Sequence, residues 1–246
     1  MSTAILLHGA WHGGWSWDLV AAVLREPPGW ATVAPDLPAG DGGAGLAAYA
    51  QVAVEALDAS DGEQSPNGGA RGDGIVVVGH SLGALVAPVV AERLLAAGRR
   101  VTALVLVCPL CPEPGVSARD QARAEPGIYT AAYRTAALVR HADGSTSMPA
   151  DVASDLIYDD CPAGPAAAAL ARMRPQHWKV FFEPSPLVAW PRVETRIVAA
   201  EGDRLLGRPG VEAAARRLGI DLTWLPGGHA PMLTRPEDVA INIRGG

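Results

Sequence analysis

A β-branched run, Ile75-Val76-Val77-Val78, leads directly into the pentapeptide Gly79-His80-Ser81-Leu82-Gly83. The alanine- and valine-rich segment 84–97 that follows predicts a helix, so the pentapeptide stands at a strand-to-helix junction. A G-x-S-x-G pattern in this place predicts a turn so sharp that its serine adopts a strained backbone conformation, while the two glycines leave room for neighbouring backbone. We therefore predict that the Ser81 hydroxyl is presented at the carboxyl end of a strand, as a nucleophile.

Short apolar runs alternate with longer helical stretches along most of the chain. This alternation predicts repeated βα units, and continuously apolar strands predict a parallel sheet covered on both faces. The expected strands are Ala4–His8, Ala31–Ala34, Ile75–Gly79, Val101–Val107, Thr195–Ala200 and Asp221–Leu225. The expected helices are Trp15–Arg25, Leu46–Ala59, Leu82–Ala97 and Pro209–Leu218, with Gly98 and Gly219 at helix C-caps. The predicted fold class is α/β, with about six mostly parallel strands flanked by helices.

Two regions interrupt this alternation. Residues 60–74 are polar and glycine-rich without hydrophobic periodicity, which predicts a surface loop. From residue 113 to residue 192 the strand pattern lapses, and helical pieces are expected at 118–124, 130–140 and 165–174.

We interpret residues 113–192 as a helical cap over the carboxyl edge of the sheet. It would be inserted into a core domain formed by residues 1–112 and 193–246. The aromatic residues of this segment, Trp178 and Phe182 among them, are open to two interpretations. They form either the core of the cap or an apolar wall around the substrate.

Composition narrows the classes of partner. The net charge is −6 without a basic stripe, which argues against a nucleic-acid partner. No apolar stretch reaches the roughly 20 residues of a membrane-spanning helix, and the N-terminus resembles a core strand rather than a signal peptide. Three cysteines argue against a disulfide framework, so we expect a cytoplasmic protein. No cluster of histidine, cysteine and aspartate with the spacing of metal ligands is evident, so neither a metal nor a cofactor is expected. The expected partner is a small-molecule substrate, and a homodimer is possible.

A serine nucleophile needs a base within reach and a carboxylate that orients the base. His229 stands in a glycine-rich loop directly after the last expected strand, from which it can reach back over Ser81. Asp203 directly follows the fifth expected strand, and its competitors for the carboxylate role are Glu201 and Asp36. We predict a triad of Ser81, His229 and Asp203.

The negative oxygen of a tetrahedral intermediate needs preorganised N–H donors. The start of the helix after the elbow offers the backbone N–H of Leu82, and the loop after the first strand offers that of Ala10. Three further residues of that loop are candidates for contact with substrate: Gly9, Trp11 and His12. Two other histidines have expected packing or turn-stabilising roles: His8 and His80.

These motifs resemble the plant methyl-ester esterase and hydroxynitrile lyase family within the α/β-hydrolase superfamily. The opening His8–Trp17 (HGAWHGGWSW) is the most specific match. The other matching segments are 79–83, 158–162, 201–203 and 228–233. The resemblance spans nearly the whole chain, and alanine- and arginine-rich usage suggests a bacterial member. It implies an α/β-hydrolase fold, in which the triad follows the chain order Ser81, Asp203, His229.

The resemblance also separates two activities. Lyases of the family typically carry threonine where this chain has Gly9, and lysine where it has Ala230. Both departures imply ester hydrolysis rather than cyanohydrin cleavage. The family usually has aspartate immediately before the catalytic histidine, where this chain has Gly228, and we expect that change to affect loop packing more than chemistry.

We therefore predict a serine-dependent hydrolase that cleaves a small, largely apolar carboxylic ester through an acyl-enzyme. Two alternatives stay open. One is a lyase or cyclase of secondary metabolism, on the same fold, that uses the serine and histidine only for proton transfer. The other is a non-catalytic small-molecule receptor.

Overall fold

The computed structural model of the protein describes residues 2–64 and 74–245. Its centre is a six-stranded sheet with the order β2-β1-β3-β4-β7-β8, in which all neighbouring strands are parallel. The strands are β1 (Thr3–Leu7), β2 (Ala31–Val33), β3 (Ile75–His80), β4 (Val101–Val107), β7 (Glu194–Ala200) and β8 (Leu222–Leu225). The predicted α/β fold is confirmed, and each expected strand lies within one residue of its predicted ends.

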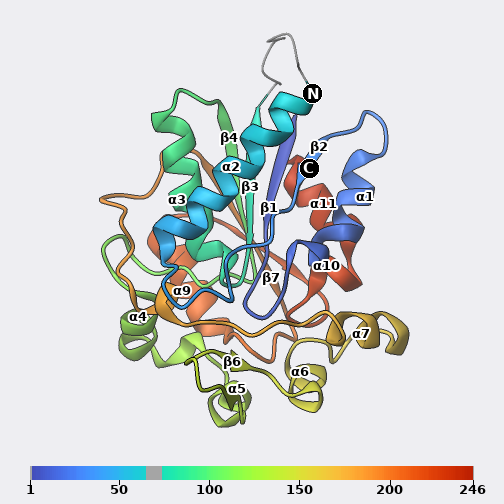
Figure 1. Ribbon diagram of the computed structural model, residues 1–246, viewed down its shortest axis with the longest axis vertical. Helices are drawn as coiled ribbons and strands as arrows, with labels where there is room; N and C mark the ends of the chain where they lie inside the picture. The colour runs from blue at the N-terminus through green and yellow to red at the C-terminus, as the bar shows by residue number, and fades with distance from the viewer. Residues whose placement is uncertain (1, 65–73, 246) are drawn as a thin grey trace.

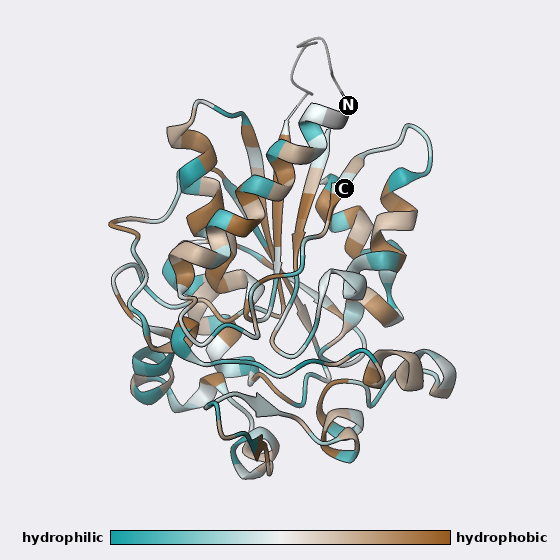
Figure 2. Cartoon of the chain, viewed as in Figure 1, coloured by the Kyte–Doolittle hydropathy of each residue, from teal (hydrophilic) through white to brown (hydrophobic). Residues whose placement is uncertain are grey.

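Helices cover both faces of the sheet (Figure 1). On one face α1 (Asp18–Arg25) packs against α11 (Pro236–Arg244), and on the other α2 (Leu46–Gln64) packs against α3 (Gly83–Ala96). Every residue of β3 is buried, and the most hydrophobic colours in Figure 2 follow the central strands. The apolar strands therefore lie between two helical layers, as strands of a parallel sheet require.

Glycines stand at the ends of two of the helices. Gly98 follows α3 with a φ of 71°, and Gly219 caps α9 (Arg208–Leu218) with a φ of 66°. Glycine adopts this left-handed conformation without a steric penalty, which frees the chain to turn back toward the sheet. The predicted C-cap Gly219 is confirmed, whereas the C-cap of α3 is Ala97 and Gly98 is the residue after it.

The polar segment after residue 60 is helical at its start. The predicted loop 60–74 is wrong there, because α2 continues to Gln64; residues 65–73 lie outside the described part of the chain. Arg99 donates hydrogen bonds to Asp58 at 2.8 Å and to Asp61 at 2.5 Å. These ion pairs hold the last turns of α2 against the chain that follows α3, and they offset the weak helix propensity of the segment.

Between β4 and β7 the chain forms a layer of short elements below the carboxyl ends of the strands (Figure 1). We call this layer, residues 113–192, the cap. Its elements are α4 (Ala118–Ala124), the 3-10 helix η2 (Pro126–Ile128), α5 (Ala131–Thr135), β5 (Val139–Arg140), β6 (Thr146–Ser147), α6 (Ala150–Leu156), α7 (Ala163–Leu170) and α8 (Lys179–Phe182).

Two of the expected cap helices are shorter than predicted. The helix expected over 130–140 ends at Thr135, and β5 then pairs antiparallel with β6. The Asp-Gly sequence at 143–144, with a φ of 86° at Gly144, supports the reversal between these strands and is a turn signal that the helical interpretation overlooked. The helix expected over 165–174 is α7, which ends at Leu170.

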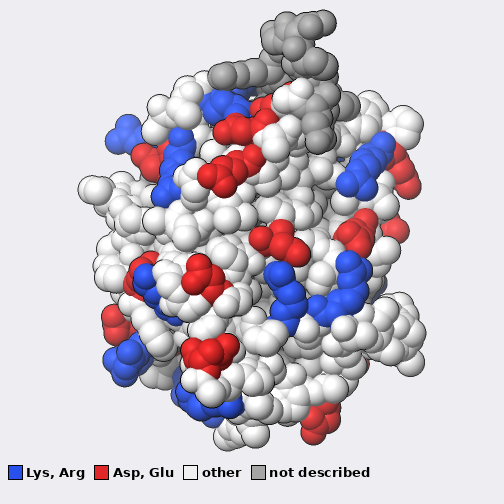
Figure 3. Space-filling view, viewed as in Figure 1, with Lys and Arg blue, Asp and Glu red and all other residues white. Residues whose placement is uncertain are grey.

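Charged side chains of both signs are intermingled over the face shown in Figure 3. Lysine and arginine do not gather into a stripe on this face, and many of them lie beside an acidic group. Within residues 2–64 and 74–245, no helix combines the length and the apolar character needed to cross a membrane.

Candidate active site

The elbow after β3 places Ser81 in the conformation that its sequence predicts. Ser81 has a φ of 51°, in the left-handed region, and its N–H donates to the carbonyl of Val107 on the neighbouring strand at 3.0 Å. A Cβ atom at Gly79 would collide with the carbonyl oxygen of Gly83, and one at Gly83 would collide with that of Leu7. Both elbow glycines are therefore required by close backbone contacts, and the strained serine is held by the sheet.

His229 and Asp203 meet beyond the ends of β8 and β7. His229 Nδ1 lies 2.7 Å from Asp203 Oδ2, and the two side chains are only 2% and 7% exposed. The other carboxylate oxygen, Oδ1, accepts the N–H groups of Leu205 at 2.9 Å and Leu206 at 2.8 Å. These bonds fix the carboxylate, which in turn fixes the imidazole with Nδ1 as the donor and leaves Nε2 to act as a base.

The structure brings the three predicted triad residues to one rim of the sheet. Ser81 and His229 line a single cavity between this rim and the cap, and Asp203 lies behind His229. The competing carboxylates lie elsewhere: Asp36 accepts the N–H of Gly14 at 2.8 Å, and Glu201 is exposed.

The two predicted oxyanion donors are available. In the described part of the chain, neither the N–H of Ala10 nor that of Leu82 donates a hydrogen bond. Ala10 lines the cavity beside Ser81, and Leu82 is the N-cap residue of α3. Unpaired N–H groups next to a nucleophile are the arrangement that stabilises a developing oxyanion.

Aromatic and aliphatic side chains from the core and the cap line most of the cavity, whose free volume is about 10 Å³. Of the candidate substrate contacts, Trp11, His12 and Trp178 line it. Phe182 does not: its side chain is 54% exposed and lies under the guanidinium of Arg119, while the adjacent Phe181 lines the cavity instead. Gly9 packs against His80, because a Cβ there would lie 2.7 Å from His80 Nδ1.

Sequence reasoning missed how His80 acts. Its Nε2 lies 2.8 Å from the carbonyl oxygen of His229, and the two rings are 4.8 Å apart. Because a carbonyl only accepts, Nε2 carries the proton, and His80 links the elbow to the loop that contains His229. Burial lowers the pKa of His80 well below its usual value, so this neutral form persists. Its position next to Ser81 was the only available signal.

Cys108 is the second residue that sequence reasoning missed. It follows β4 with a φ of 42°, and its sulfur, an Asp203 carboxylate oxygen and a His229 ring nitrogen all lie within 4.8 Å of one another. Such a trio of donors could hold a soft metal ion. Burial and the Asp203 carboxylate raise the pKa of this thiol, and the His229 Nδ1 and Asp203 already bond each other, so the arrangement favours a protonated thiol beside the carboxylate.

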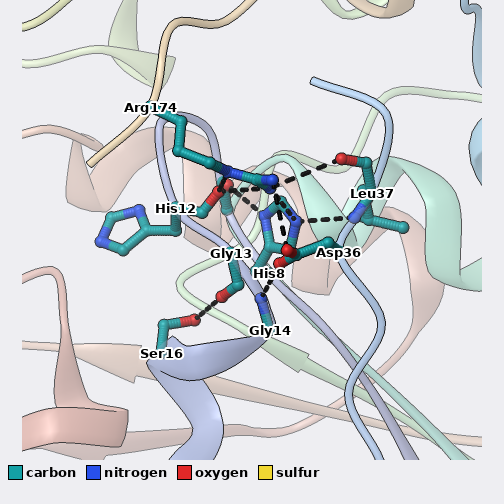
Figure 4. Close-up of polar contacts among 9 residues, drawn as sticks. His8, His12, Gly13, Gly14, Ser16, Asp36, Leu37 and Arg174 are labelled. Carbon is teal, nitrogen blue, oxygen red and sulfur yellow. Dashed lines mark hydrogen bonds and ion pairs between the residues drawn. The ribbon is translucent and has the colours of Figure 1, made fainter. Parts of the chain in front are cut away.

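The loop after β1 is held from two sides (Figure 4). His8 Nε2 accepts the N–H of Leu37 at 2.9 Å, and His8 Nδ1 lies 2.8 Å from the carbonyl of Gly9. Burial lowers the pKa of His8 to about 3, so the ring remains neutral. From the cap, Arg174 reaches over this loop and donates to the carbonyl of His12 at 2.9 Å. The turn-stabilising role predicted for His8 is confirmed.

Comparison with known proteins agrees with this architecture. A model of the alpha/beta hydrolase family matches residues 4–242. None of the curated proteins compared with the chain matches it. Three similar solved structures each align with 99% of this chain. A pyrethroid hydrolase has 22% sequence identity, 96% of its own chain covered and a TM-score of 0.77. Polyneuridine aldehyde esterase has 16% identity, 98% covered and a TM-score of 0.77, and a methylesterase from Arabidopsis has 17% identity, 98% covered and a TM-score of 0.72. The predicted resemblance is confirmed at the level of the fold, and the chain belongs to the α/β hydrolase family.

Proposed function

We propose that this protein is a serine-dependent carboxylic ester hydrolase. The observation that carries the proposal is the convergence, in one cavity, of a strained Ser81, a His229 held by Asp203, and the unpaired N–H groups of Ala10 and Leu82. These are the groups that acyl transfer uses. Among the similar structures, one is named as an esterase, one as a methylesterase and one as a pyrethroid hydrolase, which supports the same reaction class.

The reaction would proceed in two steps. Ser81 Oγ bonds to the ester carbonyl carbon while its proton passes to His229 Nε2, and the carbonyl oxygen becomes an oxyanion held by the two N–H groups. Collapse of this intermediate breaks the carbon–oxygen bond, and the leaving alcohol takes the proton from His229. Water then attacks the acyl group on Ser81 by the same route, which releases the acid and restores the serine.

The cavity supports a small, largely apolar substrate. Its wall contains Trp11, Trp178, Phe181 and two tyrosines, and among the described residues that line it no lysine, arginine, aspartate or glutamate is present. An ionised acid or amine would lose hydration without gaining a partner there. A free volume of about 10 Å³ holds about one water molecule, so binding of an ester requires side chains that line the cavity to move.

Two positions, Gly9 and Ala230, argue against cyanohydrin cleavage. A threonine side chain at position 9 would press on His80, since even a Cβ atom would lie 2.7 Å from that ring. Ala230, the position of the lysine that the lyases carry, is fully buried. Position 230 therefore offers no cation that would polarise a nitrile.

The test uses a panel of chromogenic short-chain esters with the Ser81→Ala variant as control. We expect ester turnover in the wild type, loss of kcat by several orders of magnitude in the variant, and labelling of Ser81 by a fluorophosphonate. Labelling without turnover of any ester would point to a lyase or cyclase. Absence of labelling in folded protein would point to a non-catalytic receptor.

A further inference from the structure

The side chain of His12 links the cap to the backbone of its own loop, residues 9–14, which we call the oxyanion loop. This side chain is 1% exposed, with Nδ1 2.7 Å from the carbonyl oxygen of Ala10 and Nε2 2.8 Å from the hydroxyl oxygen of Tyr158. Tyr158 follows α6 in the cap and is itself only 2% exposed. Figure 4 shows the His12 ring directed away from the Asp36, Leu37 and Arg174 cluster, so its two nitrogens are free for these contacts.

The directions of these two hydrogen bonds follow from their chemistry. A carbonyl oxygen only accepts, so the proton of the neutral ring is on Nδ1 and is donated to Ala10. Nε2 is then an acceptor, and the Tyr158 hydroxyl donates to it. Burial lowers the pKa of His12 to about 4 and raises the pKa of Tyr158, so both groups keep these roles at neutral pH.

The loop needs such external support, because it is strained. Trp11 has a φ of 61°, a conformation that costs a non-glycine residue about 1–3 kcal/mol and persists only where neighbours impose it. Its carbonyl accepts the N–H of Arg174 at 2.8 Å, and its indole N–H donates to the carbonyl of Thr146 at 3.1 Å. The cap therefore holds this loop through Arg174, Thr146 and, by way of His12, Tyr158.

We propose that Tyr158 is a positioning residue for the oxyanion hole: through the imidazole of His12 it holds the Ala10 carbonyl, and so keeps the Ala10 N–H aimed at the reacting oxygen. This inference rests on the proposed ester hydrolysis, and it gives the cap a role in the chemical step. The contact joins two chain segments 146 residues apart, so it exists only when the cap is seated on the core.

Two substitutions separate the steps of this chain of contacts. Tyr158→Phe removes the hydroxyl and keeps the ring. His12→Asn retains an N–H group that can donate to the Ala10 carbonyl, but its shorter side chain has no atom at the position of Nε2, to which the Tyr158 hydroxyl donates. We expect each variant to lower kcat about tenfold, the value of one hydrogen bond in the transition state, with KM changed less than twofold. The double variant should lose no more than either single one, because both break the same contact.

A matched control is Tyr49→Phe, which removes a buried tyrosine hydroxyl that also joins the core to the cap, because it accepts from Gln176 of the cap, but that makes no contact with His12. It should leave kcat within twofold of the wild type. Fully multiplicative losses in the double variant, or an unchanged kcat in Tyr158→Phe, would overturn the proposal.

A second measurement does not depend on ester turnover. A fluorophosphonate also develops negative charge on an oxygen beside Ser81, so its labelling rate should fall about tenfold in Tyr158→Phe. If the wild type is labelled but cleaves no ester, the proposed hydrolysis fails while the labelling rates still decide the role of Tyr158. An equal labelling rate in wild type and Tyr158→Phe would refute that role.

Discussion

Three buried histidines should make the folded protein sensitive to mild acid. Burial lowers the pKa of His8 to about 3, that of His12 to about 4, and that of His80 well below its usual value. All three lie beside the candidate active site, and each neutral imidazole is hydrogen-bonded to a backbone carbonyl oxygen. In the unfolded chain the same rings would titrate near their ordinary pKa of about 6.5.

The sign of the effect follows from proton linkage. Above about pH 6.5 neither state binds these protons, so stability is unaffected. As the pH falls below that value, the unfolded chain takes up three protons that the folded protein refuses, and the free energy of unfolding decreases until the folded-state pKa values are reached. His8 and His12 each cost about 2 kcal/mol at pH 5, about 4 kcal/mol together, and each contributes a limiting slope of about 1.4 kcal/mol per pH unit. His80 acts in the same direction. Domains of ordinary stability have only about 5–15 kcal/mol to lose.

The assay is urea unfolding followed by tryptophan fluorescence, between pH 7.5 and pH 5. In the variant His8→Gln the new side-chain oxygen can still accept the N–H of Leu37, but one proton is removed from the linkage. In this variant the change of the free energy of unfolding with pH should be smaller by about 1.4 kcal/mol per pH unit at pH 5. Even if the variant is less stable than the wild type at pH 7, its free energy of unfolding should therefore approach or exceed that of the wild type at pH 5. The exposed His141→Gln serves as the matched control. If the free energy of unfolding changes with pH equally steeply in His8→Gln and in the wild type, His8 is not one of the groups that bind a proton only in the unfolded chain.

Three further predictions concern single residues. Gly83→Ala should be destabilised by at least about 1–3 kcal/mol in thermal unfolding, because the added carbon meets the carbonyl of Leu7; an unchanged melting temperature would contradict the elbow geometry. Asp203→Asn should lower kcat about 10⁴-fold with the fold intact by circular dichroism, since the imidazole loses its charged partner; a loss under tenfold would exclude this role. Cys108, buried with a raised pKa, should resist iodoacetamide at pH 8 until urea is added, and modification of the folded protein would contradict its placement.

The sequence predicted most where local signals and topology agree. The elbow around Ser81 combines a strand, a turn that needs glycine and a helix, and these three signals reinforce one another. His229 and Asp203 were found because parallel strands all end at one edge, so residues that directly follow different strands become neighbours. That rule needs only the order of elements along the chain.

The cap could not be predicted at the same level, because its side chains are placed by tertiary contacts. Phe181 and Phe182 are adjacent and have identical side chains, yet only Phe181 lines the cavity. The reason is that α8 is a single turn, so its orientation is set by packing against its neighbours. The hydrogen bond between Tyr158 and His12 joins segments that are distant in the sequence, and no sequence spacing predicts it. Likewise, Arg174 lies outside α7 because its backbone and guanidinium bind the loop after β1.

Backbone strain is concentrated at this one rim. Trp11, Ser81 and Cys108 are the three non-glycine residues with positive φ in the described part of the chain, and they follow the adjacent strands β1, β3 and β4. Ser81 and Cys108 each donate a backbone hydrogen bond to the neighbouring strand, so the sheet itself maintains their conformations. Trp11 instead accepts its backbone hydrogen bond from Arg174 of the cap. The conformation of Ser81, the proposed nucleophile, is therefore maintained by the core alone, whereas that of the oxyanion loop depends on the cap. If the proposed roles hold, loosening the cap should impair oxyanion stabilisation before it disturbs Ser81.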